Sequence, residues 1–324
     1  MTIAIVILNW NGRALLEQFL PSVLLHSAQA TIYLADNAST DDSVAFVQER
    51  YPADIRIVQN TENLGYAGGY NAALQHIQAD VYCLLNSDVA VTEGWLRPII
   101  KAFANDETLA IAQPKLLDFK QPQKFEYAGA AGGYIDKYGY PYCRGRQFNT
   151  LEEDKGQYDA PEPVPVFWAS GACFFIRAKV FHQLAGFDEA FFAHQEEIDL
   201  CWRAHREGFK VACVTQSTVY HLGGATLATN NPKKTYLNFR NSLLMLLKNL
   251  PDKGLYTTLF LRLVLDGVAG VRFLLQGKPR LTYEIVRAHF AFYKHFAAFK
   301  QKRPKTITFK DYFQRKFFYL VVSF

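Results

Sequence analysis

The segment Leu84-Leu85-Asn86-Ser87-Asp88-Val89 closes an apolar stretch, residues 81–85, that is suited to a buried strand. Three polar residues then stand where this strand gives way to a loop. In open α/β sheets, ligands bind at the carboxyl ends of the strands. A carboxylate at such a position can hold a divalent cation, and the cation can hold a phosphate. The segment therefore predicts that Asp88 is a ligand of a metal–diphosphate unit.

The chain before this segment alternates between short apolar runs and helical patterns. Strands are expected at residues 3–8, 31–35 and 55–59, and helices at residues 13–25, after a cap at Ser39 or Thr40, and at residues 70–77. Such alternation is typical of βαβ units. The expected fold class is therefore α/β with a mostly parallel central sheet.

The chain after this segment has a different character. Residues 115–165 are rich in Gly, Pro and Tyr, which predicts loops and short strands that cover a cleft. Strands are expected at residues 166–176, 210–214 and 218–221, and helices at residues 178–184, at 196–207 and from 235 onward. We expect a catalytic-type domain over residues 1–245 and a helical extension, basic and aromatic, over residues 246–324.

Composition limits the classes of protein that this chain can be. Its 324 residues carry a net charge of +5, but residues 278–316 alone hold eleven Lys or Arg and two acids. The five cysteines show no C-x-x-C spacing, so neither a disulfide framework nor a zinc site is indicated. The start has no signal-peptide pattern, and no apolar run is long enough to span a membrane. These features predict a cytoplasmic protein, and the lack of a recognisable module argues against nucleic acid as a partner.

Polar clusters follow four predicted strands, at the edge where such sheets build ligand sites. They are Asn9–Gly12, Asp36–Ser39, Asn63–Gly69 and Asn86–Asp88. Asp36 can accept hydrogen bonds from a pyrimidine N–H or a ribose hydroxyl, or it can simply shape its turn. The glycines Gly65, Gly68 and Gly69 let backbone approach a ligand ahead of a helix N-terminus. They match neither the dinucleotide fingerprint nor the P-loop.

A second candidate region is the acidic start of the helix at residues 196–207. Glu196, Glu197 and Asp199 can complement the helix dipole, and Asp199 can pair with Arg203 one turn later. Alternatively, crowded carboxylates raise one another's pKa and supply a general base. His221 ends a later strand, either as a structural residue or as a metal ligand.

Taken together, these motifs resemble the family 2 glycosyltransferases of the GT-A fold, in particular the rhamnosyltransferase-like branch. The matching pieces run from Val6-Ile7-Leu8-Asn9 through Ala35-Asp36-Asn37, Asn63-Leu64-Gly65-Tyr66, Leu85-Asn86-Ser87-Asp88, Ser170-Gly171-Ala172 and Gly186-Phe187-Asp188-Glu189 to Glu196-Glu197-Ile198-Asp199 and His221. They occur in the family's order and span residues 3–245.

The resemblance implies an inverting transfer of a sugar from a nucleotide-diphosphate donor to a hydroxyl of a glycan or lipid-linked acceptor, in surface polysaccharide assembly. It implies Mg²⁺ or Mn²⁺ as cofactor, held by Asp88 and His221. The implied donor-binding residues are Asn9, Asn11, Asp36, Asn63, Gly65, Gly69, Asn71, Asn86 and Ser87. It implies that Glu197 occupies the position of the catalytic base, and that Glu196 or Asp199 can share in removing the proton.

Two departures from the family pattern leave alternatives open. Asn86 replaces the first acid of the D-x-D element, and Glu197 replaces an Asp. A non-catalytic subunit that binds nucleotide sugars, or a nucleotidyltransferase, therefore remains an alternative. The latter needs a Gly-rich, basic loop after the first strand, and Asn9-Trp10-Asn11-Gly12-Arg13 matches it poorly.

The basic and aromatic stretch from Phe290 to Arg303 also has more than one interpretation. It can lie on the anionic inner face of the cell membrane, as a peripheral contact. It can instead form a helical cap on the catalytic domain or a homodimer contact.

Overall fold

The computed structural model describes residues 1–147, 150–223 and 231–305, and it divides into two compact units. The first unit comprises residues 1–133, 143–192 and 196–223. The second comprises residues 134–142, 193–195 and the chain from residue 224 onward. The expected domain boundary after residue 245 lies inside helix α7 (Pro232–Asn249) and stays a prediction.

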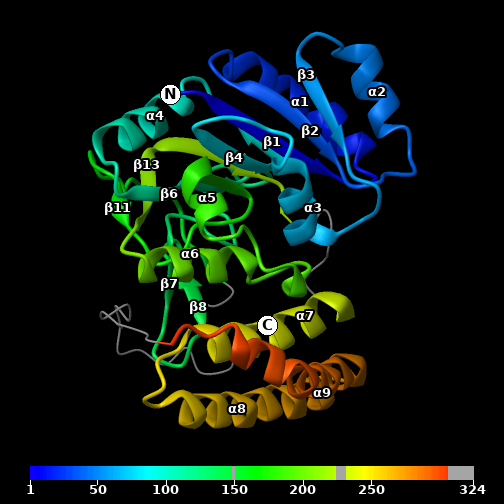
Figure 1. Ribbon diagram of the computed structural model, residues 1–324, viewed down its shortest axis with the longest axis vertical. Coiled ribbons are helices and arrows are strands. Elements are labelled where there is room, and N and C mark those ends of the chain that lie inside the picture. The colour runs from blue at the N-terminus through cyan, green and yellow to red at the C-terminus, as the bar shows by residue number, and fades with distance from the viewer. Residues whose placement is uncertain (148–149, 224–230, 306–324) are drawn as a thin grey trace. The chain divides into compact units, whose positions relative to one another are not determined.

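A nine-stranded sheet forms the centre of the first unit (Figure 1). Strands β3 (Ile55–Gln59), β2 (Thr31–Asp36), β1 (Ile3–Asn9) and β4 (Val81–Asn86) lie side by side and parallel. β12 (Cys173–Arg177) runs antiparallel between β4 and β6 (Leu109–Asp118), and β6 pairs in parallel with β13 (Lys210–His221). The short strands β5 (Val89–Val91) and β11 (Val164–Pro165) both pair with β13. The largely parallel core of this sheet, covered by helices, confirms the predicted α/β class.

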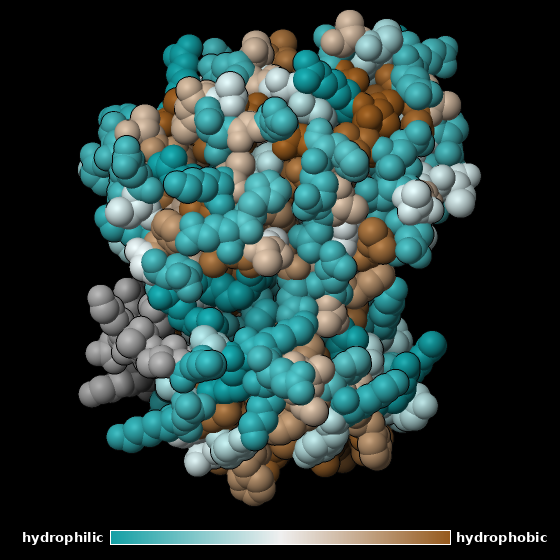
Figure 2. Space-filling model, viewed as in Figure 1, coloured by the Kyte–Doolittle hydropathy of each residue, from teal (hydrophilic) through white to brown (hydrophobic). Residues whose placement is uncertain are grey.

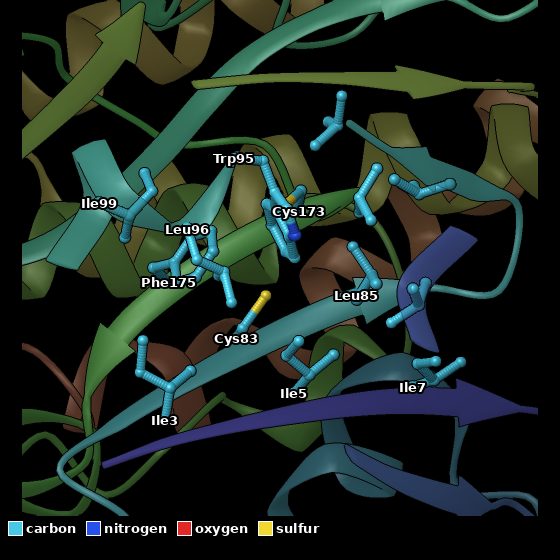
Figure 3. Packing of buried hydrophobic residues seen from close by; sticks show 14 of the residues in the cluster. Ile3, Ile5, Ile7, Cys83, Leu85, Trp95, Leu96, Ile99, Cys173 and Phe175 are labelled. Carbon is cyan, nitrogen blue, oxygen red and sulfur yellow. The ribbon is translucent and has the colours of Figure 1, made fainter. Parts of the chain in front are cut away.

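The parallel strands are apolar because both of their faces are covered. Ile3, Ile5 and Ile7 of β1 alternate with residues that face the other side, and they pack with Cys83 and Leu85 of β4 (Figure 3). Helices α1 (Arg13–His26), α2 (Ser43–Arg50), α3 (Gly65–Leu74), α4 (Leu96–Asn105), α5 (Ala178–Gln183) and α6 (Glu196–Arg206) complete this unit. Because β1, β2, β3 and β4 run parallel, their carboxyl ends all lie at the same edge of the sheet.

Residues 119–165 form loops with short strands, as expected, whereas residues 115–118 are the end of the long strand β6. These strands are β7 (Gly133–Ile135), β8 (Pro141–Cys143), β9 (Arg146–Gln147) and β10 (Thr150–Leu151), paired as β7–β8 and β9–β10.

Three expected elements differ in extent. α3 begins five residues before the expected residue 70, β12 begins seven residues after the expected residue 166, and β13 is one strand in place of two. β13 stays continuous because register shifts absorb the irregular residues between Val214 and Thr218.

The described part of the second unit is mainly helical, as predicted. Helix α9 (Pro279–Gln301) packs against both α7 and α8 (Leu255–Leu275). Their shared core contains Phe239, Phe273, Leu281 and Ile285. Among the described residues, no helix has the length and apolar character needed to cross a bilayer.

Candidate active site

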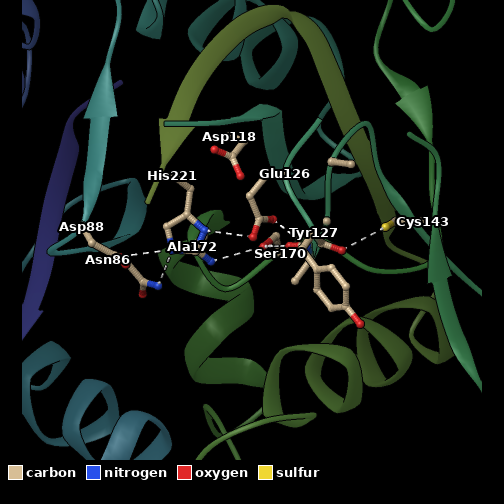
Figure 4. A network of polar contacts seen from close by, with 12 residues as sticks. Asn86, Asp88, Asp118, Glu126, Tyr127, Cys143, Ser170, Ala172 and His221 are labelled. Atoms are coloured by element: carbon tan, nitrogen blue, oxygen red, sulfur yellow. Dashed lines mark hydrogen bonds and ion pairs between the residues drawn. The ribbon is translucent and has the colours of Figure 1, made fainter. Parts of the chain in front are cut away.

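Asp88 lies directly after β4, where its carboxylate is almost fully buried. Its Oδ1 is 3.1 Å from Nε2 of His221, the last residue of β13. On the other side of the ring, Nδ1 of His221 is 3.3 Å from Oε1 of Glu126, which is also buried (Figure 4). β5 and β13 pair through Val89 and His221, so the sheet itself places the imidazole beside the end of β4.

The imidazole of His221 is therefore flanked by two carboxylates. Burial lowers the pKa of His221, but hydrogen bonds and attraction to Asp88 and Glu126 outweigh it and raise that pKa to about 10. Glu126 also accepts a hydrogen bond from the backbone N–H of Ala128 at 2.6 Å, which fixes its carboxylate. Such a partner sets which ring nitrogen of a histidine is presented to a ligand.

This pair of side chains fits a cation that the substrate helps to hold. Among the described residues, no group of three His, Cys, Asp or Glu is arranged as a complete metal site. Asp88 and His221 supply one carboxylate and one imidazole in contact with each other. Mg²⁺ in phosphate sites commonly takes one or two protein ligands, and substrate phosphates and water complete its shell. The donor set is compatible with that arrangement, and the cation would replace the proton on His221.

Asn86 and Ser87 complete the loop after β4. The backbone N–H of Asn86 donates to the carbonyl of Ala172 at 3.0 Å, and its Nδ2 is 3.5 Å from Nε2 of His221. That distance is too long for a strong hydrogen bond. Ser87 is half-buried, and a Cβ on Gly12 would lie 3.8 Å from its hydroxyl. The ends of β1, β4 and β12 thus meet in one place.

Asn9, Asn11 and Asp36 join the loops after β1 and β2. Nδ2 of Asn9 donates to Oδ1 of Asp36 at 3.1 Å and to the hydroxyls of Ser39 and Ser43 at 3.0 Å. Oδ1 of Asn11 accepts the backbone N–H of Thr40 at 2.7 Å. The predicted nucleoside-binding residues are therefore brought together, and all three also brace this edge of the sheet.

The Gly-rich segment forms the start of α3 rather than a loop ahead of it. Gly65 has a φ of +70°, and a Cβ there would lie 2.5 Å from the carbonyl oxygen of Phe192. That carbonyl accepts the backbone N–H groups of Tyr66 at 2.8 Å and Ala67 at 3.2 Å. The first amides of α3 are thus engaged by protein, and Gly69 is packed against the side chain of Asn37. These glycines do allow another group to lie close to the backbone, as predicted, but in this structure that group belongs to the protein itself.

Two asparagines of this region act as connectors. Oδ1 of Asn63 accepts the N–H of Gly65 at 2.9 Å and the side-chain amide of Asn37 at 2.9 Å. Asn71 donates to the carbonyl of Phe187 at 2.9 Å and accepts its N–H at 2.9 Å. Asn71 thereby fixes the Gly186-Phe187-Asp188-Glu189 turn that leads to α6.

The three acids at the start of α6 have different surroundings. Asp199 is fully buried and pairs with Nε of Arg203 at 2.8 Å, and Arg203 also donates to the carbonyls of Leu184 and Gly186. Glu196 is buried, and burial together with the charges of Glu197 and Asp199 raises its pKa well above the ordinary value. Glu197 is half-buried. Glu197 is therefore the least buried acid of the three.

Tyr66, in the first turn of α3, contacts the segment that precedes β12. Its hydroxyl donates to the carbonyl of Gly171 at 2.8 Å, next to Ala172, whose carbonyl accepts the N–H of Asn86. Burial raises the pKa of Tyr66, and the nearby charges of Glu196 and Glu197 raise it further. The hydroxyl of Tyr66 thus contacts the segment before β12 and lies within the electrostatic influence of Glu196 and Glu197.

Sequence reasoning missed three residues of this site. Glu126 lies in the loop-rich middle of the chain, where periodicity gives no signal. Asn37 and Tyr66 stand within quoted motifs, yet neither motif shows which neighbour they contact. Only the position of Asn37, directly after the strand-end acid Asp36, could have indicated its role.

Comparison with known proteins places this architecture in a family. The family model described as glycosyl transferase family 2 matches residues 4–184. The chain is 26% identical over 236 residues to N-acetylglucosaminyl-diphospho-decaprenol L-rhamnosyltransferase of Mycobacterium tuberculosis, covering 67% of this chain and 75% of that protein. It is 23% identical over 285 residues to a low-salt glycan biosynthesis hexosyltransferase of Haloferax volcanii, covering 85% and 86%.

A solved structure shares the fold. The mannosyltransferase from Pyrobaculum calidifontis in complex with GDP-Man and Mn²⁺ matches with a TM-score of 0.55 at 13% identity, covering 90% of this chain and 86% of that one. At that identity the likeness establishes the fold alone, which is GT-A. The chain belongs to glycosyl transferase family 2, in its rhamnosyltransferase-like branch, and is a glycosyltransferase.

Proposed function

We propose that this enzyme moves a sugar from a nucleotide-diphosphate donor to a hydroxyl group of a glycan or lipid-linked acceptor, with inversion at the anomeric carbon. The observation that carries the proposal is the buried Asp88–His221 pair at the ends of β4 and β13. The same unit holds Glu197, the least buried of the three acids at the start of α6. The matching relative in Mycobacterium tuberculosis is named for a lipid-linked substrate, which supports an acceptor of that class.

In the proposed reaction, Glu197 takes the proton of the acceptor hydroxyl as its oxygen bonds to the anomeric carbon. The bond from that carbon to the diphosphate oxygen breaks, and the nucleoside diphosphate leaves with the electron pair. Glu196 holds its proton because it is buried, so it adds no second negative charge beside Glu197. Asp199 is neutralised by Arg203 and keeps α6 in place.

A divalent cation, Mg²⁺ or Mn²⁺, would be held by Asp88 and His221 and would supply positive charge for the departing diphosphate. Asn9, Asn11 and Asp36 are the proposed contacts to the nucleoside, and Asn86 and Ser87 lie at the diphosphate end. Gly65, Gly69, Asn63 and Asn71 would act on the donor through the backbone that they hold in place. A cytoplasmic location at the inner face of the cell membrane fits a nucleotide-sugar donor and a lipid-linked acceptor.

A donor-binding screen tests the proposal. Thermal unfolding is followed with GDP-, UDP- and dTDP-sugars, each with and without Mn²⁺. We expect one class of donor to raise the unfolding temperature in a manner that depends on Mn²⁺. Asp88→Ala should lose the Mn²⁺-dependent part of this rise in unfolding temperature. Asp42→Ala, which alters an exposed acid of the same unit, should keep it. A chain that binds no donor, or an Asp88→Ala variant that responds to Mn²⁺ like the parent, would contradict the assignment.

A further inference from the structure

Helix α8 differs from an ordinary surface helix, because two charged residues lie on its buried side and a row of apolar residues lies on its exposed side. Arg262 and Asp266 are only 2% and 1% exposed, although both carry charge. The opposite side is apolar and faces solvent. We call this side the outer face, and it comprises Tyr256, Phe260, Val264, Val268, Val271 and Leu275. Amphipathic surface helices normally turn their apolar stripe to the core.

Specific contacts within the second unit hold α8 in this orientation. Arg262 donates to the carbonyl of Tyr138 at 3.0 Å and to the hydroxyl of Ser242 at 2.6 Å, and its guanidinium lies 3.6 Å from the ring centre of Tyr140. Oδ2 of Asp266 is 3.2 Å from Nε2 of His289 in α9. A rotation that buried the outer face would break these contacts and expose the apolar residues that now pack between the helices. The exposed position of the outer face is therefore built into the unit.

The outer face is continuous rather than a scatter of single apolar residues. Its residues recur every three or four positions from 256 to 275, with exposures that range from 48% for Val264 to 84% for Leu275. Apolar atoms are visible over α8 in the space-filling view, at its lower edge (Figure 2). α9 carries a similar exposed stripe of Tyr283, Val286, Phe290 and Tyr293. Exposed apolar surface on this scale marks a binding site for a protein or a membrane.

The charges around the outer face decide between these two occupants. From residue 253 to residue 305 the chain has two acids, Asp266 and Glu284, and both are buried. Lys253, Lys278, Arg280 and Lys294 are exposed over the same span. A second copy would bring an equal set of cations to the interface, which is unfavourable. An anionic lipid surface matches both the apolar residues and the surrounding cations.

We propose that the outer face of α8 rests on an anionic lipid bilayer, with its apolar side chains at the level of the headgroups and acyl boundary. Exposed tyrosines at its margin suit the interfacial region, where rings with one polar end are favoured. This proposal goes beyond the reaction, because it holds for any sugar or acceptor. It also locates the contact on α8, upstream of the basic stretch at residues 290–303 that the sequence indicated.

Flotation of the full chain with lipid vesicles tests the proposal. The parent should float with vesicles of equimolar phosphatidylcholine and phosphatidylglycerol, and weakly with phosphatidylcholine alone. Val264→Glu with Val271→Glu should lower partition into both vesicles about tenfold or more, since each substitution removes a valine side chain from the apolar contact. Lys278→Glu with Arg280→Glu should lower partition into the anionic vesicles only.

A matched substitution controls for added charge and for folding. Leu25→Glu alters a leucine that is 74% exposed on α1 in the first unit, and it should float like the parent. Mn²⁺-dependent donor binding should be unchanged in every variant, so a failure here is separate from a failure of the proposed reaction. Parent-like flotation of the Val264→Glu, Val271→Glu variant would overturn the proposal. So would a parent dimer in solution, measured by light scattering, that this variant converts to a monomer.

Discussion

Two adjacent carboxyl groups at the start of α6 differ in their surroundings more than in their chemistry. Glu196 is buried, and its Oε2 has no hydrogen-bond partner among the described residues. Glu197 is half-buried. The desolvation of Glu196 favours its neutral form, which leaves no second negative charge beside Glu197. The two residues thus differ in depth, because consecutive residues of a helix point in directions about 100° apart.

The buried carboxyl group predicts a pH dependence of stability. Above the ordinary glutamate pKa of 4.5, the unfolded chain loses this proton while the folded chain keeps it. The free energy of unfolding should therefore fall as pH rises, until the raised pKa of the folded state is passed. At pH values above both pKa values, a folded-state pKa that is one unit higher lowers the free energy of unfolding by about 1.4 kcal/mol.

Glu196→Gln removes this titration, so the variant should be more stable than the parent near neutral pH and its stability should change less with pH. Chemical denaturation at a series of pH values between about 5 and 8 measures the difference. Glu107→Gln, at an exposed position, should follow the parent. A Glu196→Gln variant that tracks the parent at every pH would show that Glu196 is ionised in the folded state.

At the scale of elements, local pattern predicted β1 to β4 and the helices between them, whereas β5, α4 and β6 were not predicted. The apolar run of β1 and the helical spacing of α1 are strong signals, because β1 is buried on both faces and the apolar side of α1 is buried. The start of α3 was missed since three glycines within six residues argue against a helix. That helix begins at Gly65 because Phe192, far along the chain, accepts its first amides.

The site could be predicted only in part for a similar reason. Asp88, His221 and Glu197 stand at strand or helix ends that the sequence marks, so their candidacy was visible. The contact of Glu126 with His221 joins residues 95 positions apart across loops without periodicity. The orientation of α8 was equally hidden, because the pattern shows two faces and does not show which one is turned inward.

The first residue of α3 offers a test at the element scale. Gly65→Ala places a Cβ 2.5 Å from a backbone carbonyl at a φ of +70°. We expect the free energy of unfolding to fall by about 2 kcal/mol or more, because neither the conformation nor the contact suits alanine. Gly267→Ala, in α8 with open space around it, should raise stability by about 0.5–1 kcal/mol. Thermal unfolding compares the two, and equal effects would contradict this explanation of Gly65.

At the scale of the whole molecule, every candidate residue for donor, cation and base lies in the first unit. The match to glycosyl transferase family 2, over residues 4–184, covers the sheet edge where most of these residues stand. The second unit contributes a helical surface of different character, apolar and basic. The account thus assigns chemistry to the first unit and lipid contact to α8 of the second.

The most direct test of the central claim is the rate of sugar transfer by two isosteric variants, Glu197→Gln and Glu196→Gln, with the donor that the screen identifies. Loss of a general base commonly lowers the rate about 100- to 10,000-fold. We predict a loss of that size for Glu197→Gln, with Mn²⁺-dependent donor binding retained, and a rate within about tenfold of the parent for Glu196→Gln, since glutamine resembles a neutral carboxyl group. Full activity of Glu197→Gln, or the larger loss in Glu196→Gln, would contradict the assignment of Glu197 as the base.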